Sequence, residues 1–238
     1  MFDAIMSGLS GLYSNLFKQR VSSSNIANIN TPGYKAVQVD AVASGPGSAS
    51  TRVGASQRQG AFVATNGSLD LTIEGNGFFK VMDDDANVAY TRAGRFHIDS
   101  EGYLATSDGL RVSPPVKVGG DISEVRVGSD GSLTGMNTQT GQVEKLGRLQ
   151  LNQFPNSAGL SPLGGGKYAQ STESGSPTWA APGTGGLGTI RSGGLEMSNV
   201  DLTAEMVNQT LAERGVEANV KSIQTSDEML GTILDMAE

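Results

Sequence analysis

The sequence predicts an α+β fold, with one helix near each end of the chain and a β-rich middle. Apolar residues recur at helical spacing near both termini, whereas the middle shows period-two alternation interrupted by frequent turns. The chain also has 33 glycines in 238 residues. Average usage of roughly 7% would give about 17, so the excess indicates many turns between short strands.

The first helix is predicted to run from residue 2 to about residues 28–30. Its apolar residues repeat at spacings of three and four, which is typical of a coiled-coil seam, and Met6, Tyr13 and Phe17 widen the stripe. Pro32 should end the helix, because the residue before a proline avoids the helical region. The seam of this helix consists of Phe2, Ile5, Leu9, Leu12 and Leu16, with Ile26 further along the same register.

The last helix is predicted to begin within about two residues of Asp201, with Ser198–Asp201 supplying the N-cap. Glycines interrupt both helices, and each costs about 1 kcal/mol relative to alanine in a helix interior. Such weak helices need their stripes covered, either by the protein's own body or by neighbouring subunits. The stripe of the last helix consists of Leu202, Met206, Val216, Val220, Ile223, Leu230 and Leu234.

These patterns divide the chain into three regions. Residues 1–35 and 198–238 should form a helical inner domain, and residues 67–197 a β-rich outer domain. Residues 36–66 are small, polar and glycine-rich, which predicts a linker or a loosely held extended arm.

Local patterns in the middle predict antiparallel hairpins. Strands are expected at 69–73 and 77–82, the second followed by a turn over 83–87. Two segments, Phe96–Leu104 and Val125–Leu133, share an alternating strand, an acidic-glycine turn and a returning leucine.

Charge and composition exclude several classes. The net charge is −7, and residues 196–238 alone hold nine acidic and two basic groups, so we expect a solvated acidic helix face there. No basic patch with interleaved aromatic residues predicts a nucleic-acid partner. No apolar run predicts insertion into a membrane, and the first twenty residues do not resemble a cleavable signal peptide.

No catalytic, cofactor-binding or metal-binding site is predicted. His97 is the sole histidine and cysteine is absent, whereas metal and triad sites need a constellation of residues. Gly166-Lys167 lacks the other residues of a phosphate loop, and Gly75 and Gly77 lack the third glycine of a dinucleotide site. Residues 83–94 match only the first positions of a calcium loop, and a solvated turn is the better interpretation. The sequence therefore favours a structural protein over an enzyme.

Segments at both ends and in the centre resemble one protein family. Residues 24–35, which read SNIANINTPGYK, resemble the N-terminal signature of bacterial flagellar rod and hook proteins. Residues 69–81 and 90–102 resemble the central motif of that family, and residues 195–207 and 222–230 resemble its C-terminal signature. The residues that carry the N-terminal motif are Asn25, Asn28, Thr31, Pro32, Gly33 and Tyr34.

The resemblance implies an axial subunit of the flagellar basal body or hook, exported by the flagellar type III apparatus. In such proteins the paired terminal helices form the inner part of a helical tube, so the two stripes would contact other copies of the chain and related rod or hook proteins. It further implies a location outside the cytoplasmic membrane and contact with the outer ring, or bushing, proteins.

Several identities remain open at this point. A distal rod subunit is favoured, with a proximal rod subunit next and a short hook protein third. Two departures bear on this choice: Gly215-Val216 replaces an aromatic contact of many relatives, and the arm after Tyr34 is short. A secreted adhesin or binding module would explain the β-rich middle, but not the two terminal stripes.

Overall fold

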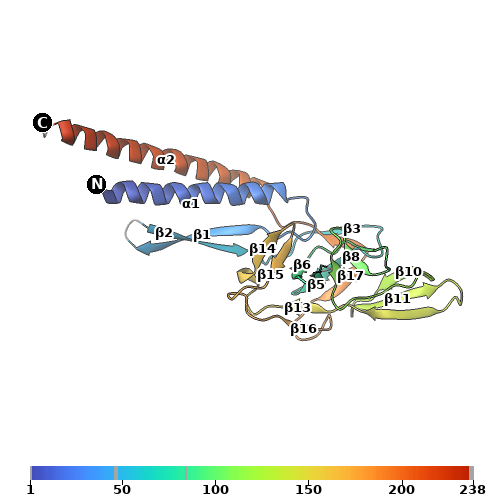
Figure 1. The fold of residues 1–238 in the computed structure, drawn as a ribbon. Helices are drawn as coiled ribbons and strands as arrows, with labels where there is room; N and C mark the ends of the chain where they lie inside the picture. Colours follow the sequence, from blue (N-terminus) through green and yellow to red (C-terminus); the bar gives the residue numbers. More distant parts are fainter. Residues whose placement is uncertain (1, 46–47, 84, 236–238) are drawn as a thin grey trace. The chain divides into compact units, whose positions relative to one another are not determined.

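The computed structural model describes residues 2–45, 48–83 and 85–235 (Figure 1). The chain divides into two compact units. The helical unit comprises Met1–Ile29, Ala36–Gly54 and Val200–Glu238, and the β body comprises Asn30–Lys35 and Ala55–Asn199. Two helices and an antiparallel β-rich middle confirm the predicted α+β class.

The helical unit pairs helix α1 (Phe2–Ala27) with helix α2 (Leu202–Asp235). They lie side by side and run in opposite directions, as Figure 1 shows in blue and red. Helix α1 ends just before the predicted range, and a turn occupies residues 28–30. Asp201 caps α2 as expected, because its Oδ1 accepts the N–H groups of Thr203 (2.9 Å) and Ala204 (3.2 Å).

The segment predicted as a linker or extended arm contains strands. Strands β1 (Val37–Gly45) and β2 (Ser48–Ala55) pair in a two-stranded sheet, and β3 (Phe62–Ala64) pairs with β18 (Gly194–Glu196) in the β body. Small polar residues do not prevent this pairing, because hairpin hydrogen bonds come from the backbone.

The β body is built from antiparallel sheets. The largest follows the order β14-β15-β6-β5-β9-β8-β7, with β13 joining β5 to β16. A three-stranded sheet has the order β10-β11-β12, and β17 pairs with β4. The remaining strands of the body are β4 (Leu71–Glu74), β5 (Phe78–Met82), β6 (Val88–Thr91), β7 (Phe96–Ile98), β8 (Leu104–Thr106), β9 (Arg111–Val112), β10 (Ile122–Val127), β11 (Ser132–Asn137), β12 (Val143–Arg148), β13 (Leu151–Gln153), β14 (Ser161–Gly164), β15 (Lys167–Ala169), β16 (Thr178–Ala180) and β17 (Thr189–Ser192), with one short 3-10 helix at Ser157–Gly159.

The structure confirms the predicted hairpins. Ile98 faces Leu104 across β7 and β8, and Val127 faces Leu133 across β10 and β11. The turn after β5 also forms as expected, since Met82 pairs with Val88. Of that turn, Asp84 lies outside the described residues.

The core of the body sits between these sheets. Its main cluster is formed by fully buried aliphatic side chains such as Leu71, Ile73 and Leu133, with Phe79 packed edge-to-face on Phe96. A second, aromatic cluster brings Phe78, Tyr90, Phe154 and Tyr168 together around Leu160. Burial of each side chain of this size stabilises the fold by about 1.5–3 kcal/mol. These two clusters therefore hold together strands that are distant in the sequence.

Candidate assembly interface

Helices α1 and α2 approach each other closely at glycines. A β-carbon at Gly11 would lie 2.7 Å from Asn219 Oδ1, and one at Gly215 would lie 2.5 Å from Asn15 Nδ2. One at Gly8 would lie 2.9 Å from Ile223 Cγ1. These glycines lower helix propensity, as the sequence indicates, but the structure shows what they permit: a side chain of the partner helix occupies the space that a β-carbon would need.

The contact becomes polar toward the C-terminal end of α1. Ser22 and Asn25 are buried there, and both bind Glu205 of α2: Ser22 Oγ donates to the Glu205 backbone oxygen (2.9 Å) and Asn25 Nδ2 to Glu205 Oε1 (2.8 Å). Asn25 also exchanges two hydrogen bonds with the Val37 backbone, at 2.8 and 2.9 Å. This motif residue therefore ties together α1, α2 and the start of the hairpin. Sequence periodicity missed Ser22 and Glu205, because hydrogen-bonding partners at a seam leave no apolar signal.

The predicted seam residues fall into two groups. Most are half-buried, so the pairing of α1 with α2 covers only part of each side chain. Three on α2 are exposed. The side chains of Phe2 and Leu234 lie outside the described residues. The half-buried residues are Ile5, Leu9, Leu12, Leu16, Ile26, Val216, Ile223 and Leu230, and the exposed ones are Leu202, Met206 and Val220.

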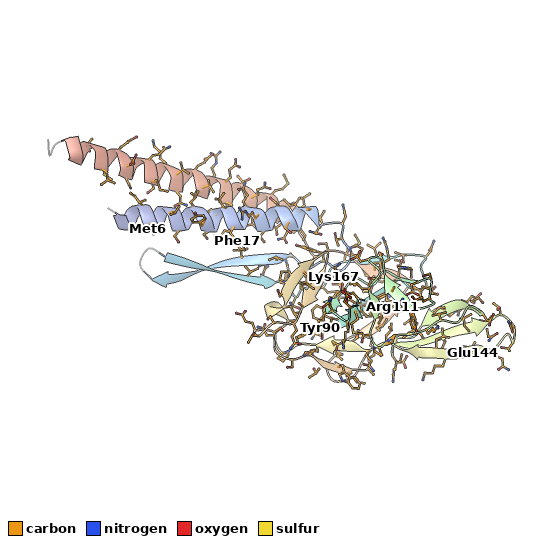
Figure 2. The ribbon with its side chains drawn as sticks, viewed as in Figure 1. Met6, Phe17, Tyr90, Arg111, Glu144 and Lys167 are labelled. Atoms are coloured by element: carbon orange, nitrogen blue, oxygen red, sulfur yellow. The ribbon has the colours of Figure 1, made fainter. Side chains whose placement is uncertain are left out.

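Large apolar side chains also stay exposed beside the seam. Met6 is 64% exposed and Tyr13 is 65% exposed on α1, and Leu211 is 64% exposed on α2. A shallow groove follows α1. Two of the residues that line it, Met6 and Phe17, are labelled on this helix in Figure 2. The groove is lined by Met6, Leu9, Ser10, Tyr13, Ser14, Leu16, Phe17 and Arg20. Contiguous exposed apolar surface of this kind marks interaction sites in soluble proteins.

The rest of the N-terminal motif lies in two places. Asn28 donates from Nδ2 to the Ser24 backbone oxygen (2.8 Å) and extends the last turn of α1. Thr31, Pro32, Gly33 and Tyr34 belong to the β body, where Gly33 and Tyr34 are buried. Gly33 adopts a φ of +71°, and a β-carbon there would overlap the backbone of Arg92 and Ala93, so only glycine fits without a shift.

One acidic residue departs from the expected solvated face. Glu196 is fully buried in the β body, where its carboxylate pairs with Lys35 and Arg92. Neither partner is near it in sequence, which explains why charge counting could not find the cluster.

The residues that the sequence analysis considered for catalysis or metal binding lie on a strand and in a turn of the β body. His97 lies on β7 with an exposed side chain. Asp83 Oδ1 accepts the N–H groups of Asp85 (3.1 Å) and Asn87 (2.9 Å), so its carboxylate closes the turn. The Asn87 side-chain amide, which donates to Asp83, is the main reason that the pKa of this carboxyl lies below its usual value. Across the described residues, no group of three or more histidine, aspartate or glutamate side chains is placed to hold a metal.

Comparison with known families places these features in order along the chain. A family model for flagella basal body rod proteins matches residues 5–35, which hold α1 and the N-terminal motif. A model for the D1 domain of the flagellar hook proteins FlgE/F/G matches residues 72–135, and one for the C-terminal region of flagellar basal body rod FlgEFG proteins matches residues 191–236.

Full-length relatives decide the family. The flagellar basal-body rod protein FlgG of Bacillus subtilis is 35% identical, and the match covers 99% of both chains. This chain belongs to the FlgG family. The FlgG of Borreliella burgdorferi is 32% identical over 97% of each chain. The flagellar hook protein FlgE of Helicobacter pylori is 35% identical over 64% of this chain, which is only 21% of that hook protein. FlgG membership therefore fits the chain from end to end, whereas the hook likeness is partial.

Membership in the FlgG family agrees with the helical unit described above. Two of the three family models fall on the helices and the motif that joins them to the body. In the part of the chain that the structure describes, neither helix is apolar enough over a sufficient length to cross a membrane. Both helices of this FlgG-family chain carry large apolar side chains that stay exposed, among them Met6, Tyr13 and Leu211.

Proposed function

We propose that this chain is a structural subunit of the flagellar axis, a rod subunit of the distal type, and that it assembles with copies of itself and with other axial proteins. The observation that carries this function is the match to FlgG proteins over nearly the whole chain. Since those relatives are structural rod proteins, the same match argues for a structural role and against an enzyme.

Assembly through the helical unit is the mechanism that the exposed residues support. Helix α1 spans roughly 39 Å and α2 roughly 51 Å at 1.5 Å per residue, and both leave apolar side chains uncovered along their length. Packing these helices against those of neighbouring subunits would bury the stripes, in a coiled-coil-like lattice that builds the inner wall of a tube. Each apolar side chain buried in this way contributes about 1.5–3 kcal/mol.

The finer features follow from the family likeness. We propose export by the flagellar type III apparatus, a place in the extracytoplasmic part of the basal body, and contact with the outer ring proteins that surround the rod. A secreted adhesin is disfavoured, because the likeness to rod proteins includes both terminal helices and the motif between α1 and the body.

Substitution of Met206 tests the surface that faces other subunits. Met206 is 58% exposed, so Met206→Asp should leave the single chain folded and yet place an unpaired charge in the interface. We expect loss of motility and loss of the subunit from purified basal bodies. The control is Asn208→Asp, which adds the same charge at an exposed polar position two residues away. Normal incorporation of the Met206→Asp chain into basal bodies would show that the face of α2 around Met206 is not part of the interface.

Substitution within the α1–α2 contact tests the seam itself. Leu12→Asp and Ile223→Asp change half-buried seam positions, so both should block incorporation and weaken the helix pair while the β body stays folded. The matched controls are Ser23→Asp and Ser222→Asp, which lie exposed on the same helices. Assembly of either seam variant at the level of its control would refute the assignment of the seam.

Limited proteolysis of the dilute chain tests whether the helices need neighbours. Isolated helices with interior glycines are marginal, so we expect the chain to be trimmed to about residue 29 and from about residue 200. The resistant fragment should begin at Asn30, because residues 30–35 belong to the body. Helices that resist protease in the dilute monomer would contradict assembly as the source of their stability.

A further inference from the structure

Three charged side chains meet in the interior of the β body. Glu196 Oε1 accepts hydrogen bonds from Lys35 Nζ (2.6 Å) and from the Gly60 N–H (2.9 Å), and Glu196 Oε2 lies 3.3 Å from Arg92 Nη1. The three charged side chains are only 2%, 1% and 4% exposed for Lys35, Glu196 and Arg92. Water therefore contributes little to solvating them, and each depends on the others.

The cluster joins the stretch of the body that follows α1 to the stretch that precedes α2. We name residues 30–35 the N-terminal strap and residues 194–199 the C-terminal strap. Backbone hydrogen bonds also join the two straps. The Gly33 N–H donates to the backbone oxygen of Glu196 (2.7 Å), and the Asn199 N–H donates to the backbone oxygen of Tyr34 (3.4 Å).

A third segment holds both straps at one point. The backbone oxygen of Arg58 accepts from Lys35 Nζ (2.7 Å), which comes from the N-terminal strap. The same oxygen accepts from Asn199 Nδ2 (2.7 Å), which comes from the C-terminal strap. If either strap leaves, this acceptor and the Glu196 carboxylate lose a partner while the other strap is still in place.

The charges in the cluster do not balance, and this makes Glu196 its most sensitive member. Two cations share one carboxylate, and Arg92 is otherwise held by a bond from Nη2 to the Gly75 oxygen (2.6 Å) and by the ring of Phe78 at 5.5 Å. Arg92 Nε is buried without a hydrogen-bond partner. Burial and the nearby Arg92 charge hold the pKa of Lys35 below its ordinary value of 10.5. Loss of Glu196 leaves two buried cations, whereas loss of Lys35 leaves one neutral pair.

We propose that Lys35, Arg92 and Glu196 form a lock that makes the two straps dock and release as one unit. Opening the N-terminal strap removes Lys35 from the Glu196 carboxylate and also breaks the backbone bonds that hold residues 196 and 199. Opening the C-terminal strap takes the only acidic member of the cluster from both cations. The N-terminal strap follows α1 and the C-terminal strap precedes α2. The segments that link the two helices to the body therefore dock or release together.

Hydrogen–deuterium exchange of the full chain, followed by mass spectrometry, tests this lock. Removing one partner of a buried ion pair shifts equilibria by about a hundredfold or more, and Glu196→Gln should accelerate exchange in both straps by that order. Lys35→Met should accelerate both straps by a smaller factor, because a neutral pair of Arg92 and Glu196 remains. Acceleration by Lys35→Met in residues 30–35 alone would overturn the lock.

Two controls separate the lock from ordinary loss of stability. Arg148→Met removes an exposed ion pair with Asp130 elsewhere in the body and should leave both straps unchanged. Leu133→Ala opens a cavity in the main core and should raise exchange throughout the body without preference for the straps. If Glu196→Gln gives the same uniform pattern as Leu133→Ala, the cluster acts as general packing and the proposal fails. Should Glu196→Gln not fold, the pattern of Lys35→Met still decides.

Discussion

Replacing Gly33 with alanine should destabilise the β body by more than the strain of a left-handed backbone conformation alone. Gly33 combines a φ of +71° with a position where a β-carbon would overlap the backbone of Arg92 and Ala93. The left-handed backbone costs an alanine about 1–2 kcal/mol. The overlap involves main-chain atoms, which no side-chain rotation can relieve, and overpacking of this kind costs about 1–3 kcal/mol more. We therefore expect Gly33→Ala to lower the free energy of unfolding by about 2–5 kcal/mol.

A matched glycine separates the two contributions. Gly109 has a φ of +83°, but a β-carbon there would have no neighbour within 4 Å. Gly109→Ala should therefore lose only the conformational part, about 1–2 kcal/mol. Urea unfolding of both full-length variants, followed by circular dichroism, measures the difference. Equal losses for the two variants would refute the close backbone packing that we assign to this motif residue.

Three further predictions concern other parts of the molecule. Gly231→Ala should stabilise α2 by about 1 kcal/mol, because a β-carbon there would have no neighbour within 4 Å. Gly11→Ala should lose this gain on α1, because its β-carbon would displace the Asn219 side chain. Thermal unfolding followed by helical circular dichroism compares the two variants. Burial raises the pKa of Tyr168 to about 12, so the unfolded chain ionises first above about pH 10 and the free energy of unfolding should fall by about 2.3 kcal/mol by pH 12. Tyr168→Phe should lack this loss in urea unfolding at each pH. The Tyr103 N–H lowers the pKa of Asp99, so its contribution is present above about pH 4 and is lost in acid, and Asp99→Asn should show a flatter acid limb of stability. A steeper acid limb for Asp99→Asn, an unchanged alkaline limb for Tyr168→Phe, or the same gain in helix stability for Gly11→Ala as for Gly231→Ala would each contradict the reasoning for that site.

Local patterns in the sequence were enough to predict the main elements. The spacing of Leu9, Leu12 and Leu16 gives a helical stripe wherever the chain ends up, because it reflects the helical repeat alone. The acidic-glycine turns at residues 99–102 and 128–131 likewise act within a few residues, and both form hairpins in the structure. Features of this kind depend on neighbours in sequence and can be predicted from it.

Features that depend on distant partners could not be predicted in this way. Lys35 and Glu196 are 161 positions apart, and nothing near either residue indicates an ion pair. The helix glycines predicted weak helices, but the neighbours of Gly11 and Gly215 on the other helix give them a second role in close packing. Ser22 and Asn25 lie next to the predicted apolar register, not on it, and only the position of Glu205 on α2 explains why these polar residues are buried.

The strap-to-strap bond between Gly33 and Glu196 has a consequence for how such chains can vary in length. The segment that follows α1 and the segment that precedes α2 are joined by one backbone hydrogen bond of 2.7 Å, from Gly33 to Glu196. The chain between them, which includes the β1–β2 hairpin of the helical unit as well as the body, is therefore an excursion with adjoining ends between the two paired helices. An excursion with adjoining ends can be enlarged or exchanged without altering the register of the flanking helices. Chains that share these ends can therefore carry outer modules of very different size on the same inner scaffold.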